Sequence, residues 1–144
     1  MATTEADRLR QFAITRRLEA AGFRAWPATS THYDGTWAVR LTTSFPAKRL
    51  NSVNPLDPSD DRDIEGRIAR ARAHFAAAGR ELIFRQSPLA PPALKAHLDA
   101  EGWESFGESV VFTADLATLD LSDALDRIPI LSLIHISEPT RLGM

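Results

Sequence analysis

The fold is decided by the stretch YDGTWAVRLTTSFPAKRLNSVNPLDP, residues 33–58. It opens with Asp34-Gly35, and a two-residue Asp-Gly loop supplies the positive φ values of a type I′ turn between two strands. Apolar and polar residues alternate over residues 36–42, which is typical of a half-buried strand. We therefore predict a β-hairpin with arms at 28–33 and 36–42 and its turn at Asp34-Gly35.

The second half of the same stretch is rich in polar side chains. After Phe45-Pro46 ends the strand, the run KRLNSVNP at 48–55 carries two cations and two amides. Pro55 and Pro58 keep this run from forming helix. We expect ligand contacts here, with candidate substrate-binding residues in this run and in the following apolar segment: Arg49, Asn51, Asn54 and Arg85. A structural role stays open as the alternative, because strand-end arginines and turn asparagines also occur without any ligand.

Composition narrows the class of protein. The 144 residues are 44% hydrophobic, as in a globular domain, and 17 Lys and Arg against 19 Asp and Glu give a net charge of −2. This balance argues against a nucleic-acid partner. The chain has no cysteine, no apolar leader segment and no apolar run approaching the roughly 18 residues of a membrane span. We expect a cytoplasmic protein without a membrane partner.

Three helices are predicted from hydrophobic periodicity and end signals. The first begins after a Thr4 cap, with Asp7 in the capping-box position where glutamate is preferred, and ends near Ala21 at Gly22. Its apolar side is made by Leu9, Phe12, Ala13, Ile14, Leu18 and Ala21. The second spans 64–78, with the strict apolar stripe Ile64, Ile68, Ala71, Phe75 and Ala78, an Asp63–Arg67 pair and a stop at Gly79. The third spans 92–101 and is opened by Pro91-Pro92.

Short apolar runs predict two more strands, at 82–86 and 108–113, and residues 115–130 read as a short amphipathic helix or a linker. Helices that alternate with strands, together with the hairpin, predict an α/β fold with a mixed, mainly antiparallel sheet packed with helices. The predicted core consists of Trp37, Val39, Leu41, Ile68, Phe75, Ile83, Phe84, Leu98, Val110 and Phe112.

Several chemistries are excluded by spacing. Residues 57–65 place oxygen ligands at alternate positions like a calcium loop, but Arg62 stands where glycine is needed and Ile68 where a bidentate glutamate is needed. An acidic helix start explains these residues better. The histidines do not share metal-ligand spacing, and no nucleophile elbow or phosphate loop is present.

The predicted order of helices and strands, together with four motifs, resembles the N-terminal half of a group of bacterial GNAT-superfamily N-acetyltransferases. The motifs are WAVRL, KRLNSVNPL, LIFRQSP and LDAEGW. The resemblance covers about residues 8 to 116. It implies a GNAT-like domain at 1–116, a linker at 117–130 and a further C-terminal unit of the same chain that carries the acetyl-CoA site. The complete protein would then transfer acetyl from acetyl-CoA to a small-molecule or peptide amine.

The chain departs from that family at the cofactor loop. An active GNAT unit carries Q/R-x-x-G-x-G/A before its central helix, so that backbone N–H groups hold the pyrophosphate. The corresponding run is LDPSDDRD at 56–63, where a proline lacks its N–H and four aspartates repel phosphate. We expect no acetyl-CoA binding and no activity from this chain itself, and its sequence assigns no catalytic residue. The alternative is a non-catalytic scaffolding or small-ligand module that binds an anion through Arg49 and Arg85.

The last residues have a different character. The run LSLIHISEPTR at 131–141 is similar to the translation of a transposon-end sequencing adapter. We expect that 131–144 is not natural protein and give it no role. A genuine C-terminal strand, LSLIHI, is the alternative.

Overall fold

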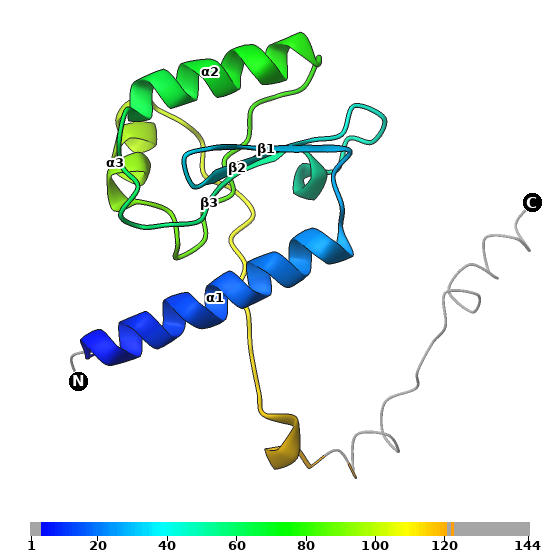
Figure 1. Cartoon of the computed structure of the whole chain (residues 1–144), viewed down its shortest axis with the longest axis vertical. Helices are drawn as coiled ribbons and strands as arrows, with labels where there is room; N and C mark the ends of the chain where they lie inside the picture. Colours follow the sequence, from blue (N-terminus) through cyan, green and yellow to red (C-terminus); the bar gives the residue numbers. More distant parts are fainter. Residues whose placement is uncertain (1–3, 121, 123–144) are drawn as a thin grey trace, which may run out of the picture. The chain divides into compact units, whose positions relative to one another are not determined.

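The structure is a computed structural model that describes residues 4–120 and 122. It divides into two compact units, Met1–Glu104 and Ser105–Met144. The first unit holds nearly all of the secondary structure (Figure 1). The predicted tail at 131–144, and the part of the predicted linker after residue 122, lie outside the described residues.

The first unit opens with α1, Glu5–Ala25. Thr4 and Asp7 form the capping box that the sequence predicts: the Thr4 hydroxyl accepts from the Asp7 N–H at 3.1 Å, and Asp7 accepts from the Thr4 N–H at 3.3 Å. The predicted stop at Gly22 is wrong, because the helix continues to Ala25 and the Trp26 N–H bonds to the Gly22 carbonyl. A glycine lowers the stability of a helix but does not end it when the residues on both sides continue the backbone hydrogen bonds.

The hairpin is formed by β1, Ser30–Asp34, and β2, Trp37–Leu41, which pair antiparallel with Asp34 opposite Trp37. Its loop is therefore Gly35-Thr36, one residue later than predicted. Of these two loop residues, only Gly35 has a positive φ, at 62°. A glycine in the first loop position with an ordinary residue after it is typical of a type II′ turn, so the type I′ prediction is wrong.

The sheet has the order β1-β2-β3, with β3 at Ser52–Pro55 antiparallel to β2. A short 3-10 helix, η1, Lys48–Leu50, precedes β3. Beyond β3 the predicted strand at 82–86 makes only a parallel bridge, in which the Val53 N–H donates to the Ile83 carbonyl at 2.8 Å and the Arg85 N–H to the Val53 carbonyl at 2.9 Å. The sheet therefore has three antiparallel strands, and the parallel pairing expected in a mixed sheet is limited to this single bridge.

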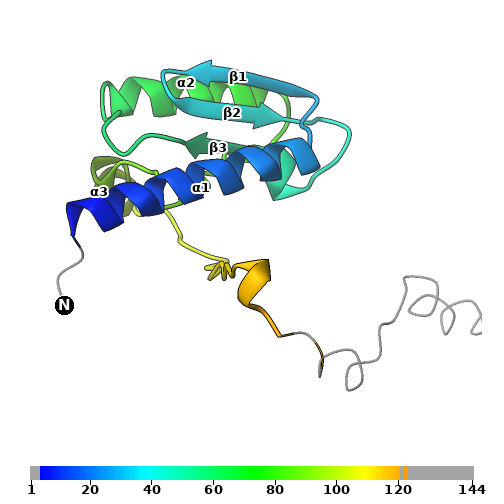
Figure 2. The same ribbon diagram turned by 60° about the horizontal axis from the view of Figure 1, so that its bottom comes forward.

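The core lies on one face of this sheet. α2, Ile64–Ala77, and α3, Pro92–Ala100, cover that face, while α1 runs along the opposite one (Figures 1 and 2). Side chains that alternate along β2 and β3 meet the inner stripes of the two helices; the buried cluster is Trp37, Val39, Leu41, Val53, Ile68, Ala71, Phe75, Leu94 and Leu98. Phe84 is half-buried and packs edge-on against Trp37 with ring centroids 5.8 Å apart. The predicted helices at 64–78 and 92–101 are confirmed within a residue.

Two expectations about burial are wrong. β2 is buried along its whole length rather than on one side, because α1 and the η1 segment cover the second face and enclose Ala38 and Arg40. On α1 the predicted apolar side is largely exposed at Ile14 and Leu18. The helix instead turns Phe12, Thr15, Glu19 and Phe23 toward the rest of the unit, as half-buried residues at helical spacing.

The second unit contains η2, Leu116–Thr118, capped by Asp115, whose carboxylate accepts from the Ala117 N–H at 2.9 Å. The predicted strand at 108–113 is wrong for the described residues: no strand is formed, and Val110 and Phe112 are 73% and 90% exposed instead of buried. A run of β-branched and aromatic residues needs a neighbouring strand for its hydrogen bonds, and none pairs with it here.

Candidate functional site

Two of the four predicted binding residues lie on the sheet face that α1 covers, which we call the polar sheet face and define as Tyr33, Ala38, Arg40, Ser52, Asn54 and Arg85. The register places Asn54 opposite Ala38 and Ser52 opposite Arg40. Because Val53 pairs in parallel with Phe84, and both turn toward the core, Asn54 and Arg85 lie side by side on the other face. The structure thus places these two residues on one face of the sheet, and their role in substrate binding stays a prediction.

Arg85 makes an ion pair across the layers. Its Nη1 donates to the Glu19 carboxylate of α1, although the two residues are 66 positions apart in the sequence. The Glu19 side chain is largely buried, whereas that of Arg85 is half exposed. Burying a carboxylate is costly without a paired cation, so this pair ties α1 to the end of the sheet. Sequence reasoning missed Glu19, since nothing in the helical pattern distinguishes it from a solvent-exposed acid.

Arg40 is the second cation of the polar sheet face and, unlike Arg85, it is buried. Its guanidinium donates to three carbonyls, those of Arg49 at 2.8 Å, Phe23 at 3.5 Å and Trp26, and its Cζ lies 4.3 Å from the centre of the Phe23 ring. Burial lowers the pKa of Arg40, and the nearby charge of Arg85 lowers it further. Arg40 therefore fastens the C-terminal end of α1 to the segment before β3.

Asn54 is 2% exposed and only partly satisfied. Its Nδ2 donates to the Ser52 carbonyl at 3.0 Å, to Ser52 Oγ at 3.2 Å and to the Ala38 carbonyl at 3.4 Å. Its Oδ1 has no hydrogen-bond partner within the described part of the chain. A buried carbonyl without a donor is costly, so this atom marks a place where a donor from water or a ligand would stabilise the protein.

The other two predicted binding residues have structural contacts that place them elsewhere. Asn51 is buried in the loop before β3, where its Oδ1 accepts from the Thr42 N–H at 2.8 Å and its Nδ2 donates to the carbonyls of Phe45 and Ala47 at 2.8 and 3.0 Å. These bonds account for Asn51 without a ligand. Arg49 is exposed, with its Cζ 5.5 Å from the centre of the Trp26 ring.

The acidic loop before α2 forms a buried ionic cluster. Asp60 is 7% exposed and accepts from the Thr36 N–H at 2.8 Å, from Thr36 Oγ1 at 2.7 Å and from the Arg67 guanidinium at 3.0 and 3.1 Å. Burial by itself would raise the pKa of Asp60, but the hydrogen bonds from Arg67 and Thr36, together with the Arg67 charge, outweigh it and hold the pKa well below its usual value. The predicted Asp63–Arg67 pair is wrong, because Arg67 turns to Asp60 and to the hairpin residue Asp34.

Arg67 and the hairpin turn fit closely together. Its Cζ lies 3.9 Å from the centre of the Trp37 ring, and its Nη2 also donates to the Asp34 carbonyl. A Cβ placed on Gly35 would lie 2.5 Å from Arg67 Nη2 and 2.6 Å from Asp60 Oδ2. Glycine is therefore required at position 35 both for its φ and for this close approach. A signal in the sequence was available, since Arg67 lies three residues after Ile64 and four before Ala71, on the same side of the helix as the apolar stripe.

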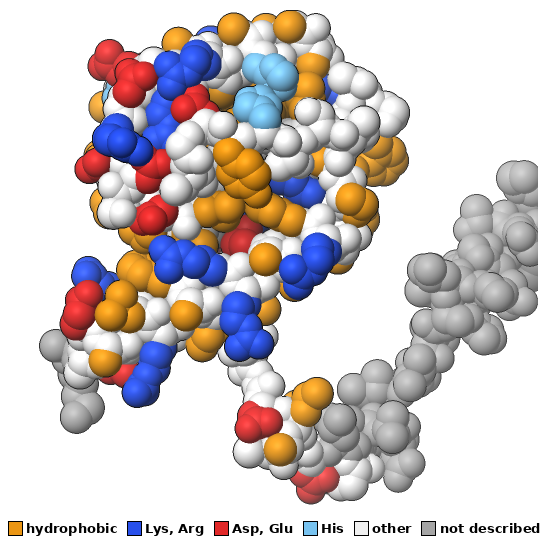
Figure 3. All heavy atoms as spheres, in the orientation of Figure 1, with side chains coloured by type: hydrophobic (Ala, Val, Ile, Leu, Met, Phe, Trp, Pro, Cys, Tyr) orange, Lys and Arg blue, Asp and Glu red, His pale blue; other side chains and the backbone are white. Residues whose placement is uncertain are grey.

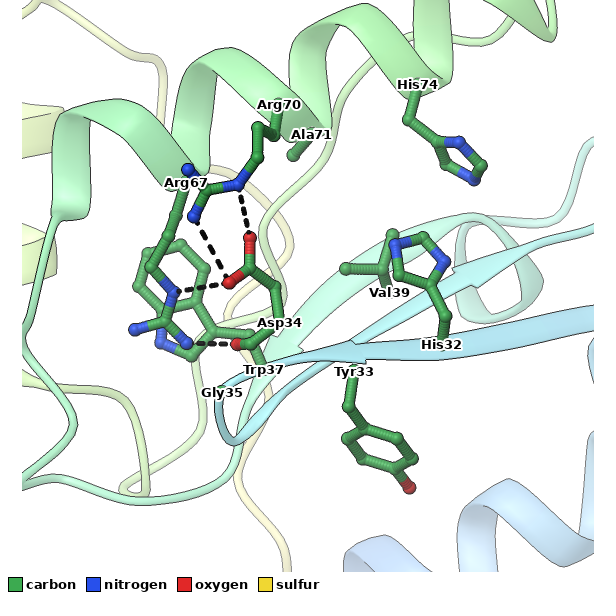
Figure 4. A pocket seen from close by; sticks show the side chains of 10 residues that line it. All are labelled: His32, Tyr33, Asp34, Gly35, Trp37, Val39, Arg67, Arg70, Ala71 and His74. Carbon is green, nitrogen blue, oxygen red and sulfur yellow. Dashed lines mark hydrogen bonds and ion pairs between the residues drawn. The ribbon is translucent and has the colours of Figure 1, made fainter.

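A hollow of about 360 Å³ opens between β1, β2 and α2 (Figure 4). Trp37, Val39 and Ala71 line its apolar part, and Asp34 lies at one end with its carboxylate bound by Arg70 at 2.9 and 3.2 Å. At the other end the rings of His32 and His74, one from β1 and the other from α2, lie close together (Figure 4). Tyr33 points to the opposite side of the sheet.

Comparison with known proteins adds no assignment: no family model, curated protein or solved structure matches the chain. Among residues 4–120 and 122, no three His, Cys, Asp or Glu side chains are arranged to hold a metal ion. No helix of the described part is long and apolar enough to cross a membrane.

Proposed function

We propose that this chain is the N-terminal part of a bacterial GNAT-type N-acetyltransferase, and that it supports the acetyl transfer without binding acetyl-CoA itself. Acetyl would pass from acetyl-CoA, held by a C-terminal unit of the same protein, to an amine. The proposal rests on the four motifs WAVRL, KRLNSVNPL, LIFRQSP and LDAEGW. It is supported by the order of elements: a helix, a hairpin and a third strand are followed by a second helix, after which the chain runs parallel to the third strand.

The observation that carries the second half of the proposal is the structure of the loop between β3 and α2. This is where a cofactor-binding unit would place its phosphate loop. Asp60 fills the space beside Arg67 with a carboxylate, and Asp63 begins the helix in the left-handed region with φ of 49°. The buried cation Arg67 is thus already neutralised. A pyrophosphate would meet further carboxylates there instead of backbone donors.

The polar sheet face and Glu19 of α1, which pairs with it, supply the groups that suit an amine substrate. The Glu19 carboxylate and the unsatisfied Asn54 Oδ1 are hydrogen-bond acceptors, and an amine or ammonium group is a donor. Arg85 neutralises Glu19 while the substrate is absent. In this proposal Asn54 and Arg85 orient the substrate. Arg49 lies beside the same region, since its carbonyl accepts from Arg40, and Asn51 holds the loop before β3 in place.

Two measurements test the proposal. Calorimetric titration of this chain with acetyl-CoA should give no saturable micromolar binding, with desacetyl coenzyme A as the matched ligand control. A longer product that includes the natural downstream coding sequence should release coenzyme A thiol in the presence of acetyl-CoA and a panel of primary amines. Micromolar binding by this chain would contradict the inferred role of the acidic loop.

The assay of the longer product separates two classes of function. Turnover that falls at least tenfold in N54A supports an acetyltransferase whose N-terminal part orients substrate. A folded longer product without turnover toward any amine would contradict the proposal and favour the non-catalytic scaffolding module. In that case phosphate or a dicarboxylate would be titrated into the unmodified chain and into R49A and R85A. Binding by the unmodified chain that is lost in the two variants would show that the module binds small anions.

A further inference from the structure

The two histidines of the hollow form a pair that the proposed function does not use. His32 lies on the edge strand β1 and His74 on α2, 42 positions later, yet their ring centroids are 4.7 Å apart with the planes at 84°. Histidine side chains gather into one patch on this face of the first unit (Figure 3). The fold, not the sequence spacing, creates the pair.

The pair leaves a ring nitrogen without a partner in a buried position. His74 Nε2 is shielded from solvent and has no hydrogen bond to any described residue. The neutral imidazole carries one donor and one acceptor nitrogen, and a buried nitrogen that finds neither water nor protein is costly. His32 is exposed on the edge strand.

The separation of the rings fits binding to one metal ion. With metal–nitrogen bonds of about 2.0 Å and ring centres about 1.1 Å beyond the nitrogen, two imidazoles in neighbouring positions of one ion have centres about 4.5 to 5 Å apart. The observed 4.7 Å lies in this range. The angle between the planes is not restrictive, because each ring rotates about its own metal–nitrogen bond.

The surroundings favour a transition metal over magnesium or calcium. Imidazole suits copper, nickel and zinc, whereas magnesium and calcium require several oxygen ligands. The carboxylate that lines the hollow, that of Asp34, is held by Arg70 and by Arg67 Nε at 3.4 Å. It is therefore not available as an oxygen ligand. The remaining positions of an ion would be filled by water from the open side of the hollow.

We infer that His32 and His74 together bind one divalent transition-metal ion, with copper bound more tightly than nickel or zinc. The inference is independent of the proposed acetyltransferase role, since it uses the opposite face of the sheet. Three observations carry it: the imidazoles converge from two elements, His74 Nε2 is buried without a partner, and the ring separation matches two ligands of one ion.

The test uses the full chain without a histidine tag. Copper(II) is titrated calorimetrically and followed by electron paramagnetic resonance, with magnesium as the negative ion control. We expect one copper per chain with nitrogen hyperfine structure, and at least tenfold weaker binding in H32A and in H74A. H32A is the safer variant, because His32 is exposed and its loss leaves the core intact.

The matched control removes the other histidines and keeps the pair. His97 lies on α3, with Nε2 3.3 Å from Glu101 Oε1, and His135 lies outside the described residues. H97A/H135A should bind copper as the unmodified chain does. Undiminished binding in H32A or H74A, loss of binding in the control, or no saturable binding by the unmodified chain would each overturn the inference and leave an edge-to-face ring contact.

Discussion

Replacing Asp60 by asparagine tests whether the acidic loop before α2 is held by the buried ionic cluster. The substitution keeps the shape of the side chain and one oxygen that can still accept from Thr36. It removes the negative charge that faces Arg67 at 3.0 Å. Arg67 is 4% exposed, so water cannot replace the lost carboxylate, and among the described residues the carboxylate that remains paired with it is that of Asp34.

The expected loss of stability follows from these contacts. Removal of one partner from a buried ion pair leaves an uncompensated charge and typically costs 3 to 5 kcal/mol. Because the second carboxylate, Asp34, stays 3.4 Å from Arg67 Nε, we expect the lower end, about 3 kcal/mol in the free energy of unfolding for D60N. That is a large share of the roughly 5 to 15 kcal/mol that stabilises a domain.

Urea unfolding followed by tryptophan fluorescence measures this loss at pH 7. The matched control is D61N, which alters an exposed aspartate one residue away and should change stability by less than about 0.5 kcal/mol. Because folding lowers the pKa of Asp60, its stabilisation is fully present above the unfolded value of about 3.9 and is lost as the pH falls below it. The difference between the unmodified chain and D60N should therefore shrink below pH 4. Equal stability of D60N and D61N at pH 7 would refute the reasoning.

Two further substitutions test the hairpin and its following loop. G35A should lower the free energy of unfolding by about 2 to 3 kcal/mol, because the new Cβ would lie 2.5 Å from Arg67 Nη2 and would also be strained by the φ of 62°. The control is G79A, which has a similar φ of 65° but nothing near its Cβ position, and it should cost about 1 kcal/mol in the same urea assay. Equal losses would show that Arg67 does not crowd the turn. N51A should lower the free energy of unfolding by about 2 kcal/mol, because the buried Thr42 N–H loses its acceptor. Thermal unfolding monitored by circular dichroism measures this loss, and an unchanged midpoint would show that Asn51 has only a ligand-binding role.

Local signals in the sequence were sufficient where neighbours along the chain supply the partners. The Thr4 and Asp7 capping box, the inner stripe of α2 and the Pro92 start of α3 were all predicted and are present. The capping box joins residues three positions apart, and the stripe and the proline start can be recognised within their own helix, although the partners of the stripe lie on other elements. The mixed α/β class follows from the same local patterns.

Tertiary structure decided everything that depends on which surfaces meet. The sequence could not show that α1 turns Glu19 toward Arg85 and leaves Ile14 and Leu18 exposed, nor that Arg67 takes Asp60 in place of the neighbouring Asp63. The polar sheet face and the histidine pair both join residues that are dozens of positions apart. Burial and ion pairing over such separations are set by the packing of layers, whereas a sequence pattern reports only the spacing of residues along one element.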